Sequence, residues 1–289
     1  MSEPAEFTRE AAIEIVEASP RFVGEHDRVA WQSLFAVGGV VEDPVGAAPS
    51  RKGERIRRGS DELARFYDTF IADNEIRFVV ERDIVVGSEV IRDVAIHTVL
   101  GTGLQVVVPA ILRYSLTWEA EEPRIARLEA YWELPRMSQQ ILKRGLRGLR
   151  TMLRTTWTMV RVQGLRGLTG YSKGMMRGIF GRGHEVAGQL ARLLRDGDLE
   201  GLAGLFVPGA EIESLRDDER EVLSESPVAW AERLGCGACL SLSKVIASGW
   251  VVAFRFELQR GDESSRGIGF LIFARQTRRI ERARFFLAR

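Results

Sequence analysis

The sequence has few of the features that mark a disulfide-stapled, secreted or membrane-spanning protein. Two cysteines in 289 residues are too few for a disulfide framework and suit a reducing compartment. No uninterrupted apolar run is long enough to span a bilayer, and the acidic N-terminal stretch lacks the basic and apolar regions of a secretion signal. We therefore expect a cytoplasmic protein. No cluster of His, Cys, Asp and Glu has metal-ligand spacing, so we expect neither a metal nor a cofactor.

Acidic residues are missing from one long segment, although the whole chain is nearly neutral, with a formal net charge of +1. From Arg136 to His184 the sequence has eleven Lys and Arg and no Asp or Glu. A strongly basic protein would suggest nucleic acid as the partner. One basic block in a nearly neutral protein instead indicates a local contact.

A single carboxylate lies where a strand gives way to a turn. Val40 and Val41 are β-branched and predict a strand, whereas Pro44 removes a backbone donor and Gly46 permits a turn, so the strand ends there. Asp43 lies at this edge, from which a side chain can face a pocket, and it is the candidate reactive group. An Asp before proline is more often a turn former or a helix cap, and that interpretation stays open.

Helical and strand patterns surround this stretch. The hydrophobic periodicity predicts helices over residues 8–23, 27–35 and 62–70, and strands over residues 75–86, 89–100, 104–118 and 124–132. We expect Pro20 to kink or end the first helix, and Pro109 to require an edge, a bulge or a bend. With 45% hydrophobic and 28% charged residues, the chain is expected to be globular and of the α+β class.

The order of these motifs, with EDPVG at 42–46, a helix carrying Phe66 and Tyr67, and a closing AYW strand at 130–132, resembles the ketosteroid isomerase branch of the NTF2-like (SnoaL-like) superfamily over about residues 8–135. The resemblance implies helices packed on a cone-shaped, strongly curved mixed sheet, with Asp43 as a base that moves a double bond next to a carbonyl. It also implies a pocket for a small, flat hydrophobic ligand. The implied lining is Val23, Phe66, Tyr67, Ile96, Thr98, Leu100, Val108 and Trp132. The same residues could instead fill the core of a closed cone.

The usual oxyanion donors of this family are missing at the aligned positions. Its first-helix tyrosine falls on Ser19 and its oxyanion aspartic acid falls on Ala110. Because the loss of one such donor lowers a rate by about a hundred- to a thousandfold, two hypotheses remain. One is an isomerase that acts through Asp43 on a steroid- or polyketide-like carbonyl compound, with Ser19 or Tyr67 as a replacement donor. The other is a non-catalytic binder or scaffold for hydrophobic ligands.

Residues 136–184 follow a different pattern. Their leucines, with Trp157 and Val160, recur at three and four residues, and a stripe of basic residues lies beside them. This predicts a basic amphipathic helix followed by a glycine-rich, partly flexible linker. The helix could pack between domains with a solvated basic face, or it could bind an anionic membrane peripherally. The residues proposed for that contact are Arg147, Arg150, Arg154, Trp157 and Arg161. Nucleic acid is not expected, because no known binding module accompanies the arginines.

Residues 185–289 look like a second, degenerate copy of residues 1–135. A gap-free alignment that sets Phe206 on Phe35 also sets Asp198 on Asp27 and Glu213 on Glu42, but it sets Ser214 on Asp43. The sequence therefore predicts two NTF2-like domains joined by residues 136–184, of which only the first carries the acid. We expect the two copies to pack as an internal pseudo-dimer, or the chain to form a homodimer.

Overall fold

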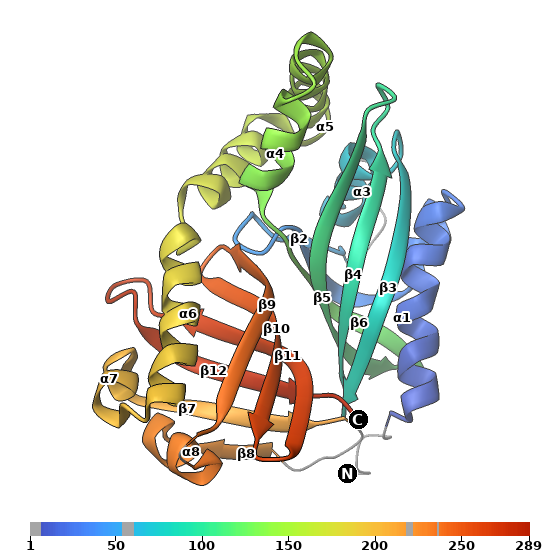
Figure 1. Ribbon diagram of the computed structural model, residues 1–289. Coiled ribbons are helices and arrows are strands. Elements are labelled where there is room, and N and C mark those ends of the chain that lie inside the picture. Colours follow the sequence, from blue (N-terminus) through green and yellow to red (C-terminus); the bar gives the residue numbers. More distant parts are fainter. Residues whose placement is uncertain (1–6, 54–60, 218–221, 236) are drawn as a thin grey trace. The chain divides into compact units, whose positions relative to one another are not determined.

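The chain folds into two units, Met1–Met176 and Arg177–Arg289 (Figure 1). The computed structural model describes residues 7–53, 61–217, 222–235 and 237–289, with the backbone alone for Met159 and residues 163–176. Each unit combines a six-stranded mixed sheet with helices. The predicted α+β class and the tandem arrangement are confirmed.

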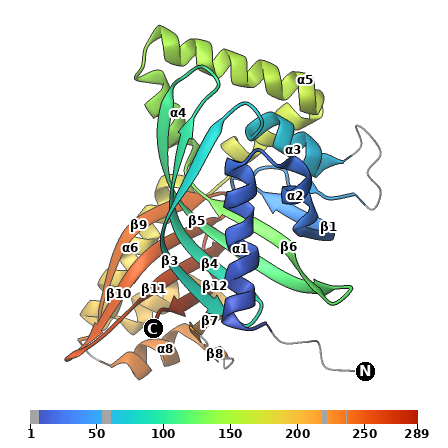
Figure 2. The same cartoon turned by 90° about the vertical axis from the view of Figure 1, so that its right-hand side faces the viewer.

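The sheet of the first unit has the order β2-β1-β6-β5-β4-β3. β1 runs parallel to β6, and the other neighbouring pairs are antiparallel. The strands are β1 (Phe35–Glu42), β2 (Ser50–Arg51), β3 (Glu75–Val86), β4 (Glu89–Val99), β5 (Gln105–Glu119) and β6 (Glu122–Tyr131). The helices are α1 (Arg9–Gly24), α2 (Arg28–Ser33), α3 (Glu62–Phe70), α4 (Leu134–Leu142) and α5 (Leu146–Met176). Figure 2 shows α1 along the sheet, and α5 passing over the ends of the long strands.

The first three helices begin at side-chain caps. Thr8, Asp27 and Asp61 each accept a backbone N–H from the first turn of α1, α2 and α3, which satisfies a donor that the helix itself leaves unpaired. α1 continues through Pro20 to Gly24, so the proline does not end it. Its buried face extends on both sides of Pro20, and this packing offsets the lost backbone hydrogen bond.

Pro109 lies in an interior strand but at a local edge. In β5 it pairs with Ala95 of β4, whereas the pairing with β6 starts only at Ile111. Pro109 therefore has a strand neighbour on one side, as its missing N–H requires. Close to it, Gln140 of α4 donates its Nε2–H to the carbonyl oxygen of Val107 at 3.1 Å. This hydrogen bond attaches α4 to the free edge of β5.

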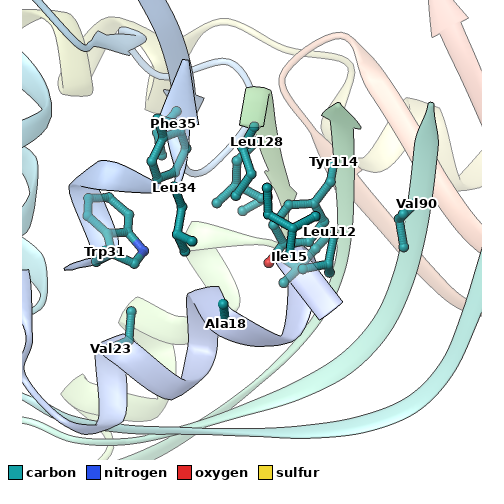
Figure 3. Packing of buried hydrophobic residues seen from close by; sticks show 14 of the residues in the cluster. Ile15, Ala18, Val23, Trp31, Leu34, Phe35, Val90, Leu112, Tyr114 and Leu128 are labelled. Carbon is teal, nitrogen blue, oxygen red and sulfur yellow. The ribbon is translucent and has the colours of Figure 1, made fainter. Parts of the chain in front are cut away.

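The core of the first unit lies between the sheet and helices α1 to α3. Figure 3 shows Trp31, Leu34 and Phe35 facing side chains of β5, β6 and α1. Trp31 is 2% exposed, and its ring lies 4.9 Å from that of Phe35 and 6.1 Å from that of Phe66. These aromatic contacts hold the short helix α2 and the start of β1 against α3.

The second unit repeats this topology. Its sheet order is β8-β7-β12-β11-β10-β9, with β7 parallel to β12. Phe206 pairs with Ile280 as Phe35 pairs with Ile125, and the second copy is confirmed at the level of topology and register. Its strands are β7 (Phe206–Arg216), β8 (Val222–Glu225), β9 (Cys239–Ser248), β10 (Val251–Arg260), β11 (Glu263–Phe273) and β12 (Ile280–Leu287). Its helices are α6 (Phe180–Asp196), α7 (Leu199–Gly204) and α8 (Pro227–Leu234).

Residues 136–184 were predicted to be a helix followed by a glycine-rich, partly flexible linker, but the glycine-rich part is largely helical. α5 stays helical to Met176, because a helix that has formed extends through glycine at a lower cost than a new one nucleates. α4 and α5 form a hairpin within the first unit, and α6 already begins the second. At the crossing, a Cβ on Gly148 would lie 1.9 Å from the carbonyl oxygen of Ile141. Only glycine permits this approach.

In the described part of the chain, no helix is both long enough and apolar enough to cross a membrane.

Candidate active site in the first unit

The first unit contains a cavity of about 390 Å³ that Asp43 lines. Its walls come from the inner faces of β3 to β6, from α1 and α3, and from the α4–α5 hairpin. Most of the lining side chains are aliphatic or aromatic. Those used below are Ser19, Trp31, Val41, Asp43, Phe66, Tyr114, Trp132, Ile141, Thr151 and Thr155.

The pleat of β1 turns Asp43 toward this cavity. Val41 and Asp43 both line it, whereas Glu42 between them pairs with Arg127 at 2.6 Å and accepts the backbone N–H of Gly46 at 2.9 Å. This alternation follows from the two-residue period of a strand. The Asp43–Pro44 peptide bond is cis. Asp43 is thus a lining residue as well as part of the turn.

The carboxyl group of Asp43 is poised to hold or release a proton near neutral pH. Burial raises its pKa from 3.8 to about 6, and a hydrogen bond from the Trp132 side chain opposes part of that rise. The donor is the indole Nε1–H and the acceptor is Oδ1 of Asp43. A carboxyl group whose pKa lies near the working pH is suited to general acid–base chemistry.

A chain of three polar side chains lies in the same cavity. Trp31 donates its Nε1–H to Oγ of Ser19 at 3.2 Å, and Ser19 is also hydrogen-bonded to the hydroxyl group of Tyr114. Burial raises the pKa of Tyr114 to about 12, so this phenol is neutral at physiological pH and carries a proton. Tyr114 lines the cavity and is 1% exposed, so this phenol is a buried group of the cavity wall that can donate a hydrogen bond.

Most of the residues expected around a ligand meet in this cavity. The lining includes Ser19, Val23, Phe66, Ile96, Thr98, Leu100, Val108 and Trp132. Tyr67 and Ala110 are not among the lining residues. Tyr67 packs against Trp31, with ring centroids 5.6 Å apart, and within the described residues its buried hydroxyl group has no hydrogen-bond partner. Ala110 is fully buried in the hydrophobic core.

Tyr114 is a cavity residue that the sequence reasoning missed. The signal was present, because Ala110, Leu112 and Tyr114 share one face of β5 at the period of a strand. The gap-free alignment placed the family's donor position on Ala110, and Tyr114 lies four residues later on the same face of the strand.

The α4–α5 hairpin supplies a second part of the lining that the sequence reasoning missed. Ile141 of α4 and the threonines Thr151 and Thr155 of α5 contribute to the wall. At the rim, Thr102 and Thr151 share a hydrogen bond of 2.7 Å between their hydroxyl groups. The leucine pattern did not predict that α5 lines the cavity, because the face of α5 that does so carries Thr151 and Thr155 and not the leucines.

The residues proposed for membrane contact lie outside this lining, apart from Arg154. Arg147, Arg150, Trp157 and Arg161 are exposed on α5. Arg154 donates to the carbonyl oxygen of Gly101 at 3.3 Å and pairs with Asp73 at 3.7 Å. Its side chain therefore fastens α5 to the rim of the cavity.

The second unit also has a cavity, of about 230 Å³, but the polar groups are replaced there. Ser214 and Leu287 line it at the positions that the strand register assigns to Asp43 and Trp132. By the same register, Leu271 occupies the position in the second unit that Tyr114 occupies in the first. The helical alignment sets Leu190 on Ser19 and Leu202 on Trp31. The acid, its donor Trp132 and the three side chains of the Trp31–Ser19–Tyr114 chain are therefore all replaced in the second copy.

Among the described residues, no group of three or more His, Cys, Asp and Glu could hold a metal ion.

Residues 16–128 match the family model of the SnoaL-like domain. This match lies entirely within the first unit, which therefore contains a SnoaL-like domain of the NTF2-like superfamily. The match ends before Trp132 and before the α4–α5 hairpin. No curated protein matches the chain.

Three solved structures give the scale of the structural similarity. A computationally designed 17-OHP binder is 22% identical, with a TM-score of 0.38, over 43% of this chain and 95% of the binder. The Delta 5-3-ketosteroid isomerase from Mycobacterium sp. is 27% identical, with a TM-score of 0.35, over 43% of this chain and 95% of that one. A protein from Mycobacterium tuberculosis in complex with estradiol-17beta-hemisuccinate is 24% identical, with a TM-score of 0.33, over the same shares of 43% and 95%.

Proposed function

We propose that the first unit is an isomerase that moves a double bond in a hydrophobic carbonyl compound, with Asp43 as the proton carrier. Asp43 takes a proton from the carbon between the carbonyl group and the double bond, and the carbonyl oxygen gains negative charge. The same carboxyl group then returns the proton to the far end of the former double bond. The atoms of product and substrate are the same, and the double bond is now conjugated with the carbonyl.

The observation that carries this proposal is the joint loss of polar groups in the second copy. Both units keep the sheet, the helices and a cavity, so these groups are not needed for the fold. Where the first unit has an acid, its donor Trp132 and the separate chain of Trp31, Ser19 and Tyr114, the second has one serine and four leucines. A cluster that is retained in one copy only, around an acid with a raised pKa, is expected of a reaction site.

Tyr114 is our candidate for the oxyanion donor. The Trp31 indole can only donate, so Ser19 accepts from it and can pass its own hydrogen to the Tyr114 oxygen. The phenol O–H is then available for the carbonyl oxygen of the substrate. Its hydrogen bond would strengthen as negative charge develops on that oxygen, which is the property that speeds a reaction.

Trp132 has a separate role in this proposal. Its indole N–H fixes Oδ1 of Asp43 and favours the charged form of the carboxyl group. This leaves Oδ2 as the oxygen that receives the proton. The indole hydrogen bond thus orients the carboxylate, while burial keeps its pKa high.

The second candidate function is a non-catalytic binder of hydrophobic ligands, which would bind the same compounds and leave them unchanged. The absence of an acid at Ala110 favours it, because one donor then has to replace two. A membrane-associated form of this binder would rely on α5. The two candidates make the same prediction for binding and opposite ones for turnover.

The experiment that separates them uses a polycyclic β,γ-unsaturated ketone and the absorbance of its conjugated product. We expect conversion by the wild-type chain, and none by Asp43→Asn, because the amide keeps the shape and the bond from Trp132 but cannot accept the proton. Ligand affinity, measured by tryptophan fluorescence, should be nearly equal in both. If the wild-type chain binds the ketone and never converts it, the isomerase proposal fails and the binder remains.

A further inference from the structure

One face of α5 presents a row of large apolar side chains to solvent. Leu146, Leu149, Leu153 and Trp157, here called the outer stripe, are between 48% and 86% exposed. Leu142, at the end of α4, is a further large apolar side chain that is 50% exposed. Residues three and four apart share one side of a helix, so these side chains form a continuous apolar surface. A surface of this kind on a soluble unit indicates an interaction site.

The opposite face of α5 packs on the first unit and lines the cavity. Thr151 is 1% exposed, and Thr151 and Thr155 line the cavity. The rim hydrogen bond between Thr102 and Thr151, together with the contacts of Arg154 to Gly101 and Asp73, fixes this orientation. The apolar face of the helix is therefore not the one that packs on the first unit.

The charge beside the outer stripe is of one sign. Arg144, Arg147 and Arg150 are exposed, and within the described residues none of the three pairs with a carboxylate. No Asp or Glu occurs between Glu133 and Glu185. A helix with exposed leucines and a tryptophan on one side, and unneutralised arginines at its flank, is complementary to a bilayer whose headgroups are anionic.

We propose that the outer stripe of α5 docks on anionic membrane. Leu149, Leu153 and Trp157 enter the interface between headgroups and acyl chains, while Arg147 and Arg150 contact lipid phosphates. This inference does not depend on the chemistry of Asp43. It places the hairpin that forms one wall of the cavity at the lipid surface, where an apolar ligand is dissolved.

The test uses the full chain and vesicles of phosphatidylcholine with or without phosphatidylglycerol. We expect cosedimentation with the anionic vesicles only, and release by salt, because exposed charges are screened. Arg147→Gln and Arg150→Gln should each weaken binding about fivefold. The fluorescence difference between wild type and Trp157→Phe should shift to the blue on anionic vesicles, as an indole leaves water.

Matched substitutions separate docking from general effects of charge and hydrophobicity. Leu149→Gln with Leu153→Gln should abolish vesicle binding, whereas Val29→Gln on the exposed side of α2 should leave it unchanged. Arg77→Gln removes the same charge from β3 and should have little effect. Circular dichroism checks that each variant is folded. Equal binding to neutral and anionic vesicles, or no binding to either, overturns the proposal. Loss of a dimer in the stripe variants, with no vesicle binding by the wild type, overturns it in favour of a second copy of the chain.

Discussion

The indole Nε1 of Trp132 donates a hydrogen bond to Oδ1 of Asp43. Each of the two residues is the first one after the end of its strand, and the two strands are parallel neighbours. β1 ends at Glu42 and β6 ends at Tyr131, with Glu42 opposite Glu129. Parallel strands bring their carboxyl ends to the same edge of a sheet. The acid and its donor, 89 residues apart in sequence, are thereby held together by the one parallel pairing in this sheet.

Removal of this donor should raise the pKa of Asp43 further. In Trp132→Phe the charged carboxylate loses its hydrogen bond while burial remains, so we expect a pKa about one unit higher than in the wild type. Carbon-13 NMR titration of labelled aspartate measures it, without reference to any substrate. The control is Trp118→Phe, since Trp118 is not a lining residue of the cavity. An unchanged titration in Trp132→Phe would contradict the role assigned to the indole.

The raised pKa of Asp43 should also make the first unit less stable at neutral pH than in mild acid. The folded state binds the proton more tightly than the unfolded chain, with a pKa of about 6 against 3.8. Stability from this group is therefore fully present below about pH 4 and is lost as the pH rises through 6. The loss amounts to about 3 kcal/mol at most.

Asp43→Asn should remove this pH dependence. Urea unfolding of wild type and variant between pH 4 and 8 gives the measurement, and the variant should gain stability relative to the wild type as the pH rises. Asp262→Asn, which deletes an exposed carboxylate, controls for net charge. A constant difference between Asp43→Asn and wild type over this range would refute a raised pKa.

If Tyr114 is the oxyanion donor, Tyr114→Phe should lower kcat by about a hundred- to a thousandfold and should change the affinity for ligand little. The ring still fills the wall of the cavity, and only the donor is lost. Ser19→Ala should have a smaller effect, because Tyr114 keeps its own hydrogen. Steady-state kinetics with the polycyclic ketone separates kcat from KM.

Tyr67→Phe is the matched control for Tyr114→Phe. Since the Tyr67 hydroxyl group is buried and lacks a hydrogen-bond partner among the described residues, its removal should leave turnover unchanged and stabilise the first unit by about 1 kcal/mol. Thermal unfolding of the variant measures the gain. A fall in kcat equal to that of Tyr114→Phe would return Tyr67 to the site and weaken the assignment of Tyr114.

The crossing of α4 and α5 makes a further prediction. In Gly148→Ala the new methyl group meets the main chain of Ile141, which cannot turn aside as a side chain would. We expect a loss of about 1–3 kcal/mol and faster hydrogen exchange in α5. Gly188→Ala in α6 has open space and should instead stabilise its helix by up to about 1 kcal/mol. Equal effects of the two substitutions on stability would contradict the close approach of Gly148 to the Ile141 backbone.

Local patterns in the sequence predicted most of the elements and the duplication, although the helix expected over 27–35 ends at Ser33 and Phe35 already begins β1. Alternating residues predicted β3 over 75–86, the range that the structure has, because a strand half-buried on a sheet needs a two-residue period. Asp27 and Asp198 cap equivalent helices, and a cap requires only neighbours in sequence. The same local logic found Asp43 at a strand end and Ser214 in its place in the second copy.

Only the tertiary structure decided which side chains face the cavity and which side of α5 faces outward. Tyr114 became a candidate through its contact with Ser19, a residue 95 positions earlier in the chain, and no local period reports such a pair. The leucines of α5 predicted a packing face, yet the hydrogen bonds of Thr151 and Arg154 to the rim turn the threonine face inward. A helix with two usable faces takes its orientation from specific contacts with its neighbours, and those contacts exist only once the chain has folded.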